Sequence, residues 1–282
     1  MNLALDDKTV WITGASGGIG RALASTFAAE GASLLLHGYG AFDQLESWIA
    51  EQPWSARALA VRADVRDPEA LEAAADAGRR RFGRLDAVVI NAGTWPAEDA
   101  PLHAIDWQRL RNTLETNLLG ALGTARAFLR GLAADGPRDD GHGASLVFVG
   151  STAGEFGERG HIDYATSKAA LVGAMKSLKN EVVALDPFAR VNLVNPGWTV
   201  THMARAALGV PGTITHVTRT MALRQLARAD DIARTIAWLS SPVAARHVSG
   251  QTITVAGGME GRLLWNADEI DEAAVRQRLS QE

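Results

Sequence analysis

Cysteine is absent from this chain of 282 residues. Its absence excludes disulfides, thiolate nucleophiles and metal sites with cysteine ligands, and it fits a reducing compartment. Long apolar runs are missing too, because no stretch approaches the roughly 18 consecutive apolar residues of a membrane-spanning helix. The first residues, MNLALDDKTVWITGAS, lack a basic leader and an extended apolar segment, so we expect no signal peptide. These absences favour a cytoplasmic protein without a membrane partner.

Basic runs and metal-ligand patterns are also missing. The formal net charge is -4 and no cluster of Lys or Arg interrupts it, which disfavours a nucleic-acid partner. The seven histidines are scattered and none is paired at ligand spacing, so we expect no metal site. Hydrophobic residues make up 47% of the chain and charged residues 21%, a balance that permits a large buried core.

Short apolar runs alternate with longer segments of helical spacing. Strands are predicted at residues 10–13, 33–37, 58–62, 87–91, 146–150, 191–194 and 252–255. Helices are predicted at residues 19–30, 42–51, 68–81, 106–132, 164–185 and 230–239. Most strands are continuously apolar, which is typical of strands covered on both faces. The repeated order predicts an α/β fold with a parallel sheet between two layers of helices.

Two segments and the tail depart from this alternation. Residues 134–143 (ADGPRDDGHG) are turn-rich and predict a surface loop, and residues 199–223 follow a strand end where substrate contacts often lie. No linker divides the chain, so we assign residues 1–262 to one dinucleotide-binding and catalytic domain. Residues 263–282 form a C-terminal tail, expected to be helical at 268–279 because acids come early and arginines late. The tail is a candidate to cover the site or to reach a second subunit.

A glycine-rich sequence, TGASGGIG at residues 13–20, joins the first strand to the first helix. Gly14, Gly18 and Gly20 permit a tight turn and a close approach of backbone N–H groups to a pyrophosphate. The helix N-terminus adds partial positive charge at the same point. A tight turn that only needs small residues is the alternative, but the position between strand and helix favours phosphate binding.

The end of the second strand, LHGYG at residues 36–40, carries no acid. A carboxylate there would bind the ribose hydroxyls of NAD and repel the 2′-phosphate of NADP. Its absence favours NADP(H) slightly over NAD(H), although no Arg or Lys is present in this stretch either. His37 and Tyr39 are equally compatible with strand-end packing.

Tyr164 and Lys168 lie four residues apart at the start of a predicted helix, so their side chains share one face. A free tyrosine has a pKa near 10, and a neighbouring ammonium lowers it by favouring the phenolate. The pair therefore suits general acid/base chemistry. In isolation, the same spacing occurs often on solvated helix faces.

Ser151 and Asn117 are two further candidates. Ser151 follows an apolar strand, at the end where ligands bind in parallel sheets, and its hydroxyl can bond a reacting oxygen. A turn-capping serine is the alternative. Asn117 lies inside a predicted helix, where a buried amide needs hydrogen-bond partners that need not be catalytic.

Together these motifs resemble the short-chain dehydrogenase/reductase family over about residues 5 to 260. The matching elements are TGASGGIG, Asp64-Val65, Asn91-Ala92-Gly93, Asn117, Ser151, YATSK at 164–168 and Pro196-Gly197. The resemblance implies a Rossmann-type doubly wound sheet of about seven parallel strands and a hydride transfer between NAD(P) and a carbonyl or alcohol. It also implies a homo-oligomer, a tetramer or a dimer.

The resemblance implies a role for each matching residue. Tyr164 would be the general acid/base, Lys168 would lower its pKa and bind the nicotinamide ribose, and Ser151 would steady the substrate oxygen. Asn117 would hold a helix irregularity and a water in a proton relay. The cofactor-binding residues would be Gly14, Ser16, Gly18, Ile19, Gly20, Asp64, Val65, Asn91, Ala92, Gly93, Tyr164, Lys168, Pro196, Gly197 and Thr201.

The substrate is less constrained than the chemistry. Residues expected to face it are Trp95, Glu155, Phe156, His161, Trp198, His202 and Met203, an aromatic mixture with some polar groups. Such a lining suits a moderately apolar small-molecule ketone or alcohol. Trp11, Trp107 and Trp238 are expected in the core. Ala256 stands where many relatives of this family carry an aspartate, and the 134–143 loop and the tail are longer than is common.

Two other functions are compatible with the fold. A catalytically silent nucleotide-binding regulator or scaffold would have lost Tyr164, Lys168 or Ser151, and all three are present. A sugar-nucleotide epimerase or dehydratase would need a larger C-terminal substrate region than this sequence has.

Overall fold

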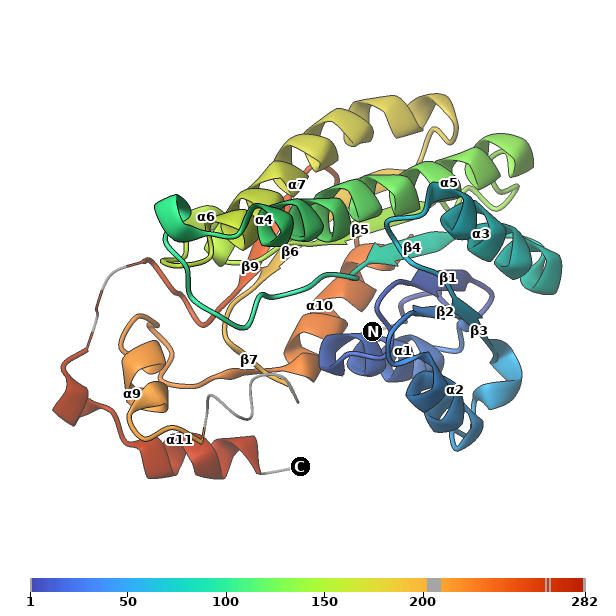
Figure 1. Ribbon diagram of the computed structural model, residues 1–282. Helices are drawn as coiled ribbons and strands as arrows, with labels where there is room; N and C mark the ends of the chain where they lie inside the picture. The colour runs from blue at the N-terminus through green and yellow to red at the C-terminus, as the bar shows by residue number, and fades with distance from the viewer. Residues whose placement is uncertain (1, 202–208, 262, 264, 281–282) are drawn as a thin grey trace.

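The computed structural model describes residues 2–201, 209–261, 263 and 265–280. Within them, seven parallel strands form one sheet in the order β3-β2-β1-β4-β5-β6-β9 (Figure 1). The strands are β1 (Thr9–Ile12), β2 (Ser33–Gly38), β3 (Ala58–Arg62), β4 (Ala87–Ile90), β5 (Ser145–Val149), β6 (Arg190–Pro196) and β9 (Thr252–Val255). Each lies within two residues of a predicted strand. The predicted parallel α/β fold is confirmed.

The strand order creates a switch between β1 and β4. The chain runs from β1 outward through β2 to β3, returns to β4 beside β1, and continues through β5 and β6 to β9. The connection from β1 leads to β2 and the connection from β4 leads to β5, so the two run in opposite directions across the sheet. The loops after β1 and β4 therefore separate at the carboxyl ends of these strands. Ligands of doubly wound sheets bind at this crevice.

Helices cover both faces of the sheet. They are α1 (Gly18–Ala29), α2 (Phe42–Ala50), α3 (Pro68–Phe82), α4 (Trp107–Leu114), α5 (Gly120–Asp135), α6 (Ala153–Phe156), α7 (Ile162–Glu181), α9 (Thr213–Thr218), α10 (Ala229–Ser240) and α11 (Glu272–Leu279). Helices α3, α5 and α7 pack on one face and α1, α2 and α10 on the other (Figure 1). Short 3-10 turns lie at Ser55–Arg57, Leu102–Ala104, Val182–Ala184 and Ala267–Glu269, and β7 (Thr199–Val200) pairs with β8 (Ala227–Arg228).

Helix α3 shows how local sequence sets a boundary. The Asp67 carboxylate accepts hydrogen bonds from the backbone N–H groups of Glu69 and Ala70, and Pro68 occupies the first helical position. At the other end, Gly83 adopts a positive φ of 86°. The predicted start at residue 68 is confirmed, because a capping acid followed by proline is a strong helix-start signal.

Two expectations are corrected by the structure. The predicted helix 106–132 is not continuous, because a π-helical turn at Glu115–Leu119 separates α4 from α5. Trp107, expected in the core, is 68% exposed; it occupies the first position of α4, whose buried residue is Thr113. Trp11 is fully buried as expected, and Trp238 is half-buried against the core on the α1–α10 face.

Of the predicted loop 134–143, residues 134 and 135 belong to the end of α5, and the rest is a loop held by ion pairs. The Arg138 guanidinium contacts the carboxylates of Asp7, Asp86 and Asp140. The loop precedes β5, so it lies at the amino ends of the strands, opposite the crevice. No helix among the described residues combines the length and apolarity needed to cross a bilayer.

Candidate active site

The glycine-rich loop leaves β1 and turns into α1 at the crevice. Two glycines of this loop have no room for a side chain. A Cβ added at Gly20 would lie 2.2 Å from the Gly14 carbonyl oxygen, and a Cβ added at Gly18 would lie 2.8 Å from Thr201 Cβ. Gly14 itself has a φ of +65°. Helix α1 begins without a side-chain cap, which leaves its first N–H groups for an anionic ligand. These donors fit a pyrophosphate, and Thr201 lies beside them.

The strand end after β4 is bonded to the glycine-rich loop. Thr13 Oγ1 accepts hydrogen bonds from the backbone N–H groups of Asn91 (3.0 Å) and Ala92 (3.1 Å). The Asn91 amide donates to the carbonyl oxygens of Thr13 (2.9 Å) and Gly14 (3.2 Å). These four bonds fix the floor of the crevice between β1 and β4.

His37 is a structural link between the glycine-rich loop and β3. Its Nδ1 accepts from the Gly14 N–H at 3.3 Å, and its Nε2 lies 2.8 Å from the Ala63 carbonyl oxygen. This pairing assigns the proton to Nε2 of a neutral ring. Burial lowers the pKa of His37 and keeps the ring neutral. Of the two sequence interpretations, strand-end packing therefore describes His37.

Asp64 and Val65 lie at the end of β3. Both oxygens of Asp64 bond to the Arg66 guanidinium, which holds the pKa of this carboxyl below its usual value. Val65 is buried, and its side chain packs closely on Gly120. A Cβ added at Gly120 would lie only 2.8 Å from Val65 Cγ2. The Val65 side chain thus belongs to the core, and its backbone remains for the crevice.

Ser151, Tyr164 and Lys168 converge at the end of β5. The Ser151 hydroxyl lies near enough to the Tyr164 phenol to lower the pKa of that phenol. The Lys168 ammonium donates to the Val149 carbonyl oxygen at 2.8 Å and lies 5.8 Å from the centre of the Tyr164 ring. The helical spacing of Tyr164 and Lys168 and the strand end at Ser151 bring these side chains together, as the sequence predicts.

Asn117 sits in the π-helical turn with no exposed surface. Its Oδ1 accepts from the Thr94 N–H at 2.7 Å, and its Nδ2 donates to the Thr94 carbonyl oxygen at 3.0 Å and to Ser167 Oγ at 3.2 Å. A Cβ at Gly93 would lie 3.2 Å from Asn117 Oδ1 and 3.3 Å from Lys168 Nζ. Asn117 therefore fixes the backbone after β4 beside the lysine.

Burial governs the protonation of the two central groups. Burial raises the pKa of Tyr164, and the negative charge of Glu158 adds to this, while the Ser151 hydroxyl opposes it. Burial alone lowers the pKa of Lys168 from 10.5 to about 8. The expected lowering of the Tyr164 pKa is thus reversed in the protein without cofactor, because loss of hydration raises this pKa by more than Ser151 lowers it. The phenol is protonated at neutral pH and suited to donate.

An ion pair that sequence reasoning missed anchors the helix that carries Tyr164. Asp163 is buried, and its oxygens bond to Arg109 Nε (3.0 Å), Arg109 Nη2 (3.1 Å) and Thr113 Oγ1 (3.0 Å). Burial raises the pKa of Asp163, but the hydrogen bonds from Arg109 and Thr113 lower it by more than burial raises it. The net shift of this pKa is therefore downward. Its only sequence signal was an acid directly before Tyr164.

Asn195 is a second missed residue. Its Oδ1 accepts from the Ser151 N–H at 3.0 Å, so it orients the backbone that carries the Ser151 hydroxyl. Asn195 precedes Pro196, which ends β6 and whose carbonyl oxygen accepts from the Thr152 N–H at 3.0 Å. Gly197 follows, packed so closely on Ala256 that a Cβ would lie 2.6 Å from the Ala256 Cβ.

Aromatic side chains flank the Tyr164 phenol. The Trp95 ring is T-shaped to Tyr164, with centroids 4.7 Å apart, and it stacks on His161 at 3.9 Å. His161 is buried and its Nε2 donates to the Pro96 carbonyl oxygen at 2.9 Å. Trp95 and Phe156 are 37% and 41% exposed, so both present apolar surface.

The other substrate candidates have different surroundings. Trp198 is half-buried and packs on the small apolar cluster around α9. Glu155 accepts from Thr254 Oγ1 at 2.9 Å and from the Asn195 amide at 3.4 Å. His202 and Met203 lie outside the described residues. Ser16 and Ile19 lie in the glycine-rich loop and at the start of α1, half-buried. Among the residues that the structure describes, no group of three potential ligands gathers to bind a metal.

The fold and this site define a dinucleotide-binding protein with a Ser-Tyr-Lys constellation. Residues 14–260 match the family described as Enoyl-(Acyl carrier protein) reductase. The chain is 32% identical over 256 residues to the 3-oxoacyl-[acyl-carrier-protein] reductase FabG of Escherichia coli, covering 90% of this chain and 98% of that protein. It is 33% identical over 266 residues to the L-rhamnose 1-dehydrogenase (NAD(P)(+)) of Azotobacter vinelandii, covering 91% and 98%.

Solved structures agree with the sequence relatives. A short-chain dehydrogenase/reductase (glucose/ribitol dehydrogenase) from Brucella melitensis superposes with a TM-score of 0.82 at 30% identity, covering 92% of this chain and 99% of that one. A short chain dehydrogenase from Burkholderia cenocepacia in complex with NADP gives 0.78 at 30% identity, covering 90% and 98%. The chain belongs to the short-chain dehydrogenase/reductase family. It is an NAD(P)-dependent oxidoreductase, and a silent scaffold is not favoured.

Proposed function

We propose that this enzyme reduces a ketone or aldehyde to an alcohol, or runs the reverse reaction, with Tyr164 as the general acid/base. The observation that carries the proposal is the convergence of the Tyr164 phenol, the Ser151 hydroxyl and the buried Lys168 ammonium at the end of β5. A bound reduced nicotinamide supplies the hydride. The Tyr164 O–H donates its proton to the carbonyl oxygen, and the Ser151 hydroxyl donates a second hydrogen bond to that oxygen.

Other residues hold this arrangement. Lys168, with its pKa near 8, binds the nicotinamide ribose and accepts or returns a proton close to neutral pH. Asn117 keeps the backbone after β4 beside Lys168 and supports a water in the proton relay. Asn91, Ala92 and Gly93 line the adenosine side, Asp64 and Val65 the adenine, and Pro196, Gly197 and Thr201 the nicotinamide.

The substrate we propose is a moderately apolar small molecule. Trp95 and Phe156 supply exposed aromatic surface, with Trp198 behind them, and this lining suits an apolar carbonyl compound. The test is the oxidation of NADPH, followed by its absorbance, in the presence of ethyl acetoacetate, cyclohexanone and acetophenone in turn. Oxidation that requires both the protein and the ketone supports the proposal, and its absence with every carbonyl compound would contradict it.

We propose that the cofactor is NADP(H), preferred slightly over NAD(H). The end of β2 carries no carboxylate, and Arg62 of β3 pairs in register with Gly38 at that strand end. The Arg62 guanidinium lies 5.3 Å from the centre of the Phe42 ring, at the first residue of α2. The sequence around residues 36–40 contained no cation because this one comes from the neighbouring strand.

Fluorescence titration is expected to give a several-fold lower Kd for NADPH than for NADH. Arg62→Ala is expected to weaken NADPH binding several-fold, because a 2′-phosphate loses a cationic partner, and to leave NADH binding unchanged. The Asp43 carboxylate, 3.7 Å from Arg62, moderates the preference. A Kd for NADH more than about tenfold lower than for NADPH, about 1.4 kcal/mol, would reverse the assignment.

We propose that the protein forms a homo-oligomer, a dimer or tetramer, and works in the cytoplasm, where a chain without cysteine is at no disadvantage. An apolar groove of about 410 Å³ lies between α5 and α7, lined by Leu122, Leu129, Leu178 and Leu185 among others. A second copy packed on this groove would bury it.

Light scattering at micromolar concentration is therefore expected to give two or four times the mass of one chain. Leu122, which is 38% exposed, is the side chain to change. Leu122→Arg places a third guanidinium beside those of Arg126 and Arg130, which line the same groove, and is expected to shift the protein toward monomers, because burying an unpaired charge is costly. A wild-type protein that is monomeric at this concentration would refute the assembly.

A further inference from the structure

The last helix of the chain lies beyond the family match and packs on the segment after β6. The family match ends at residue 260. Helix α11 follows that point in the chain and contacts α9. Val275 of α11 is buried with Ile214 and Val217 of α9 in an apolar cluster separate from the two cores of the sheet. Figure 1 shows α9 and α11 side by side, away from the sheet. The tail is therefore an ordered partner of α9.

Helix α9 has no N-cap side chain of its own, because Gly212 occupies that position. Glu272 of α11 takes over this function: its Oε1 accepts from the Thr215 N–H at 3.0 Å and from Thr215 Oγ1 at 2.7 Å. These two bonds lower the pKa of Glu272, so the group is a carboxylate at neutral pH. A negative charge at a helix N-terminus is favourable. A helix of one to two turns is marginal without such support.

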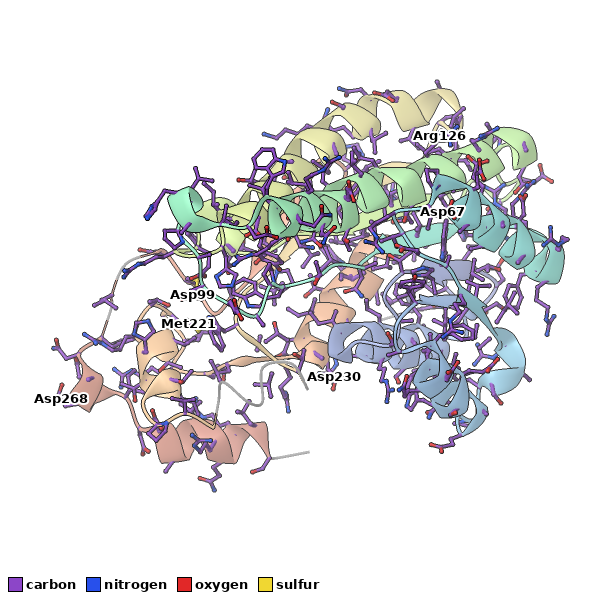
Figure 2. All side chains as sticks on the ribbon, viewed as in Figure 1. Asp67, Asp99, Arg126, Met221, Asp230 and Asp268 are labelled. Atoms are coloured by element: carbon purple, nitrogen blue, oxygen red, sulfur yellow. The ribbon has the colours of Figure 1, made fainter. Side chains whose placement is uncertain are left out.

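A second set of contacts braces the far end of the same segment. Trp265 Nε1 donates to the Met221 carbonyl oxygen at 2.6 Å (Met221 is labelled in Figure 2). The Arg219 Nε donates to the Trp265 carbonyl oxygen at 2.9 Å, and the Trp265 N–H donates to the Arg219 carbonyl oxygen at 3.3 Å. The Arg224 guanidinium lies 3.8 Å from the Trp265 ring centre. The tail thus holds residues 213–224 at both ends.

Trp198, which is proposed to face the substrate, packs against the apolar cluster that α9 and α11 form. Burial raises the pKa of Glu158, whereas His161 and, to a smaller extent, His216 of α9 lower it. The charge of Glu158 in turn raises the pKa of Tyr164. The tail also begins at this side of the site, because a Cβ at Gly261 would lie 3.2 Å from Phe156 Cδ1. Helix α9 packs on Trp198 and the residues just before the tail approach Phe156, so both border side chains that are proposed to face the substrate.

We infer that the C-terminal tail is a substrate-positioning element: Glu272 and Trp265 hold α9 in the place from which it borders the carbonyl substrate. The inference rests on the proposed function for the substrate itself. Glu272 and Trp265 touch no reacting atom and act through α9. The segment that binds substrate is thus set by residues that the family match does not include.

The test uses Glu272→Ala in the full chain, with Asp268→Ala as the matched control, since Asp268 is an exposed acid of the same tail (Figure 2). Hydrogen exchange by mass spectrometry is expected to be about tenfold faster in residues 213–221 of Glu272→Ala, the effect of a lost helix cap. Glu272→Gln, which keeps an accepting oxygen, is expected to restore most of the protection. The control is expected to match wild type.

Kinetics then connect bracing to substrate. For the best of ethyl acetoacetate, cyclohexanone and acetophenone, KM is expected to rise several-fold in Glu272→Ala, with kcat within twofold and the Kd of NADPH unchanged. Unchanged exchange in residues 213–221 would overturn the bracing, and faster exchange with an unchanged KM would overturn the positioning role. A wild-type protein that reduces none of the ketones would refute the proposed function and the substrate half of the inference, while exchange would still decide the bracing.

Discussion

Replacing Tyr164 with phenylalanine is expected to lower kcat for carbonyl reduction by about two orders of magnitude or more, the typical contribution of a positioned general acid. The phenol lies beside the Ser151 hydroxyl, and its raised pKa keeps it protonated at neutral pH. Phenylalanine keeps the ring, so the T-shaped contact with Trp95 and the burial at the start of α7 remain. The loss is therefore chemical, and the Kd of NADPH is expected to stay within a few-fold of wild type.

The chain offers a matched control for this change. It contains two tyrosines, and the other, Tyr39, is 52% exposed. Tyr39→Phe removes the same hydroxyl from a different place and is expected to leave kcat unchanged. Stopped-flow measurement of NADPH oxidation under single-turnover conditions separates the chemical step from product release. A Tyr164→Phe rate within about fivefold of wild type would show that another group delivers the proton.

The sheet was predictable from local sequence because each strand is a short, nearly continuous apolar run between turn signals. A parallel strand buried on both faces tolerates little else, so pattern and structure agree within two residues. The glycine-rich loop and the pairing of Tyr164 with Lys168 were predictable for a similar reason. Both depend on spacing within one element, and helix geometry converts a separation of four residues into a shared face.

Features that depend on distant partners could not be predicted in the same way. The π-helical turn places Asn117 so that its amide bonds Thr94, 23 positions away, and no local pattern encodes that partner. The Arg109–Asp163 ion pair joins residues 54 positions apart. Trp107 failed as a core prediction because composition alone favours burial of a large aromatic, while its position at the first turn of α4 directs it to solvent.

The pKa of Tyr164 is the most instructive difference. The sequence places the Lys168 ammonium near Tyr164 and therefore predicts a lowered pKa for the Tyr164 phenol. Only the structure shows that the site is buried and that Glu158 adds a negative charge. Both effects favour the protonated phenol, which suits reduction. In the oxidative direction, the positive charge of an oxidised nicotinamide would offset them, because it favours the phenolate.

Lys168→Met is expected to abolish most turnover and, at pH 7, to make the folded protein more stable. Burial lowers the pKa of Lys168 from 10.5 to about 8, so the folded state binds this proton less tightly than the unfolded state. Below pH 8 both states are protonated and the full cost of the buried charge is present. A shift of about 2.5 units corresponds to about 3 kcal/mol. Losing the bond to the Val149 carbonyl oxygen returns about 1 to 2 kcal/mol of this, so a net gain of about 1 to 2 kcal/mol remains.

The sign of the pH dependence makes this expectation specific. Between pH 8 and pH 10.5 the unfolded chain carries a proton that the folded chain has lost, so wild-type stability rises with pH through this window. The advantage of Lys168→Met is therefore expected to shrink from pH 8 upward, to vanish near about pH 9 and to reverse toward pH 10.5, because wild type regains about 1.4 kcal/mol per pH unit in this window. Urea unfolding at pH 7 and pH 10 measures it, with Lys176→Met as the control, an exposed lysine of the same helix. If Lys168→Met is less stable than wild type at pH 7, the ammonium stabilises the fold, and the idea that function keeps a costly buried charge is wrong.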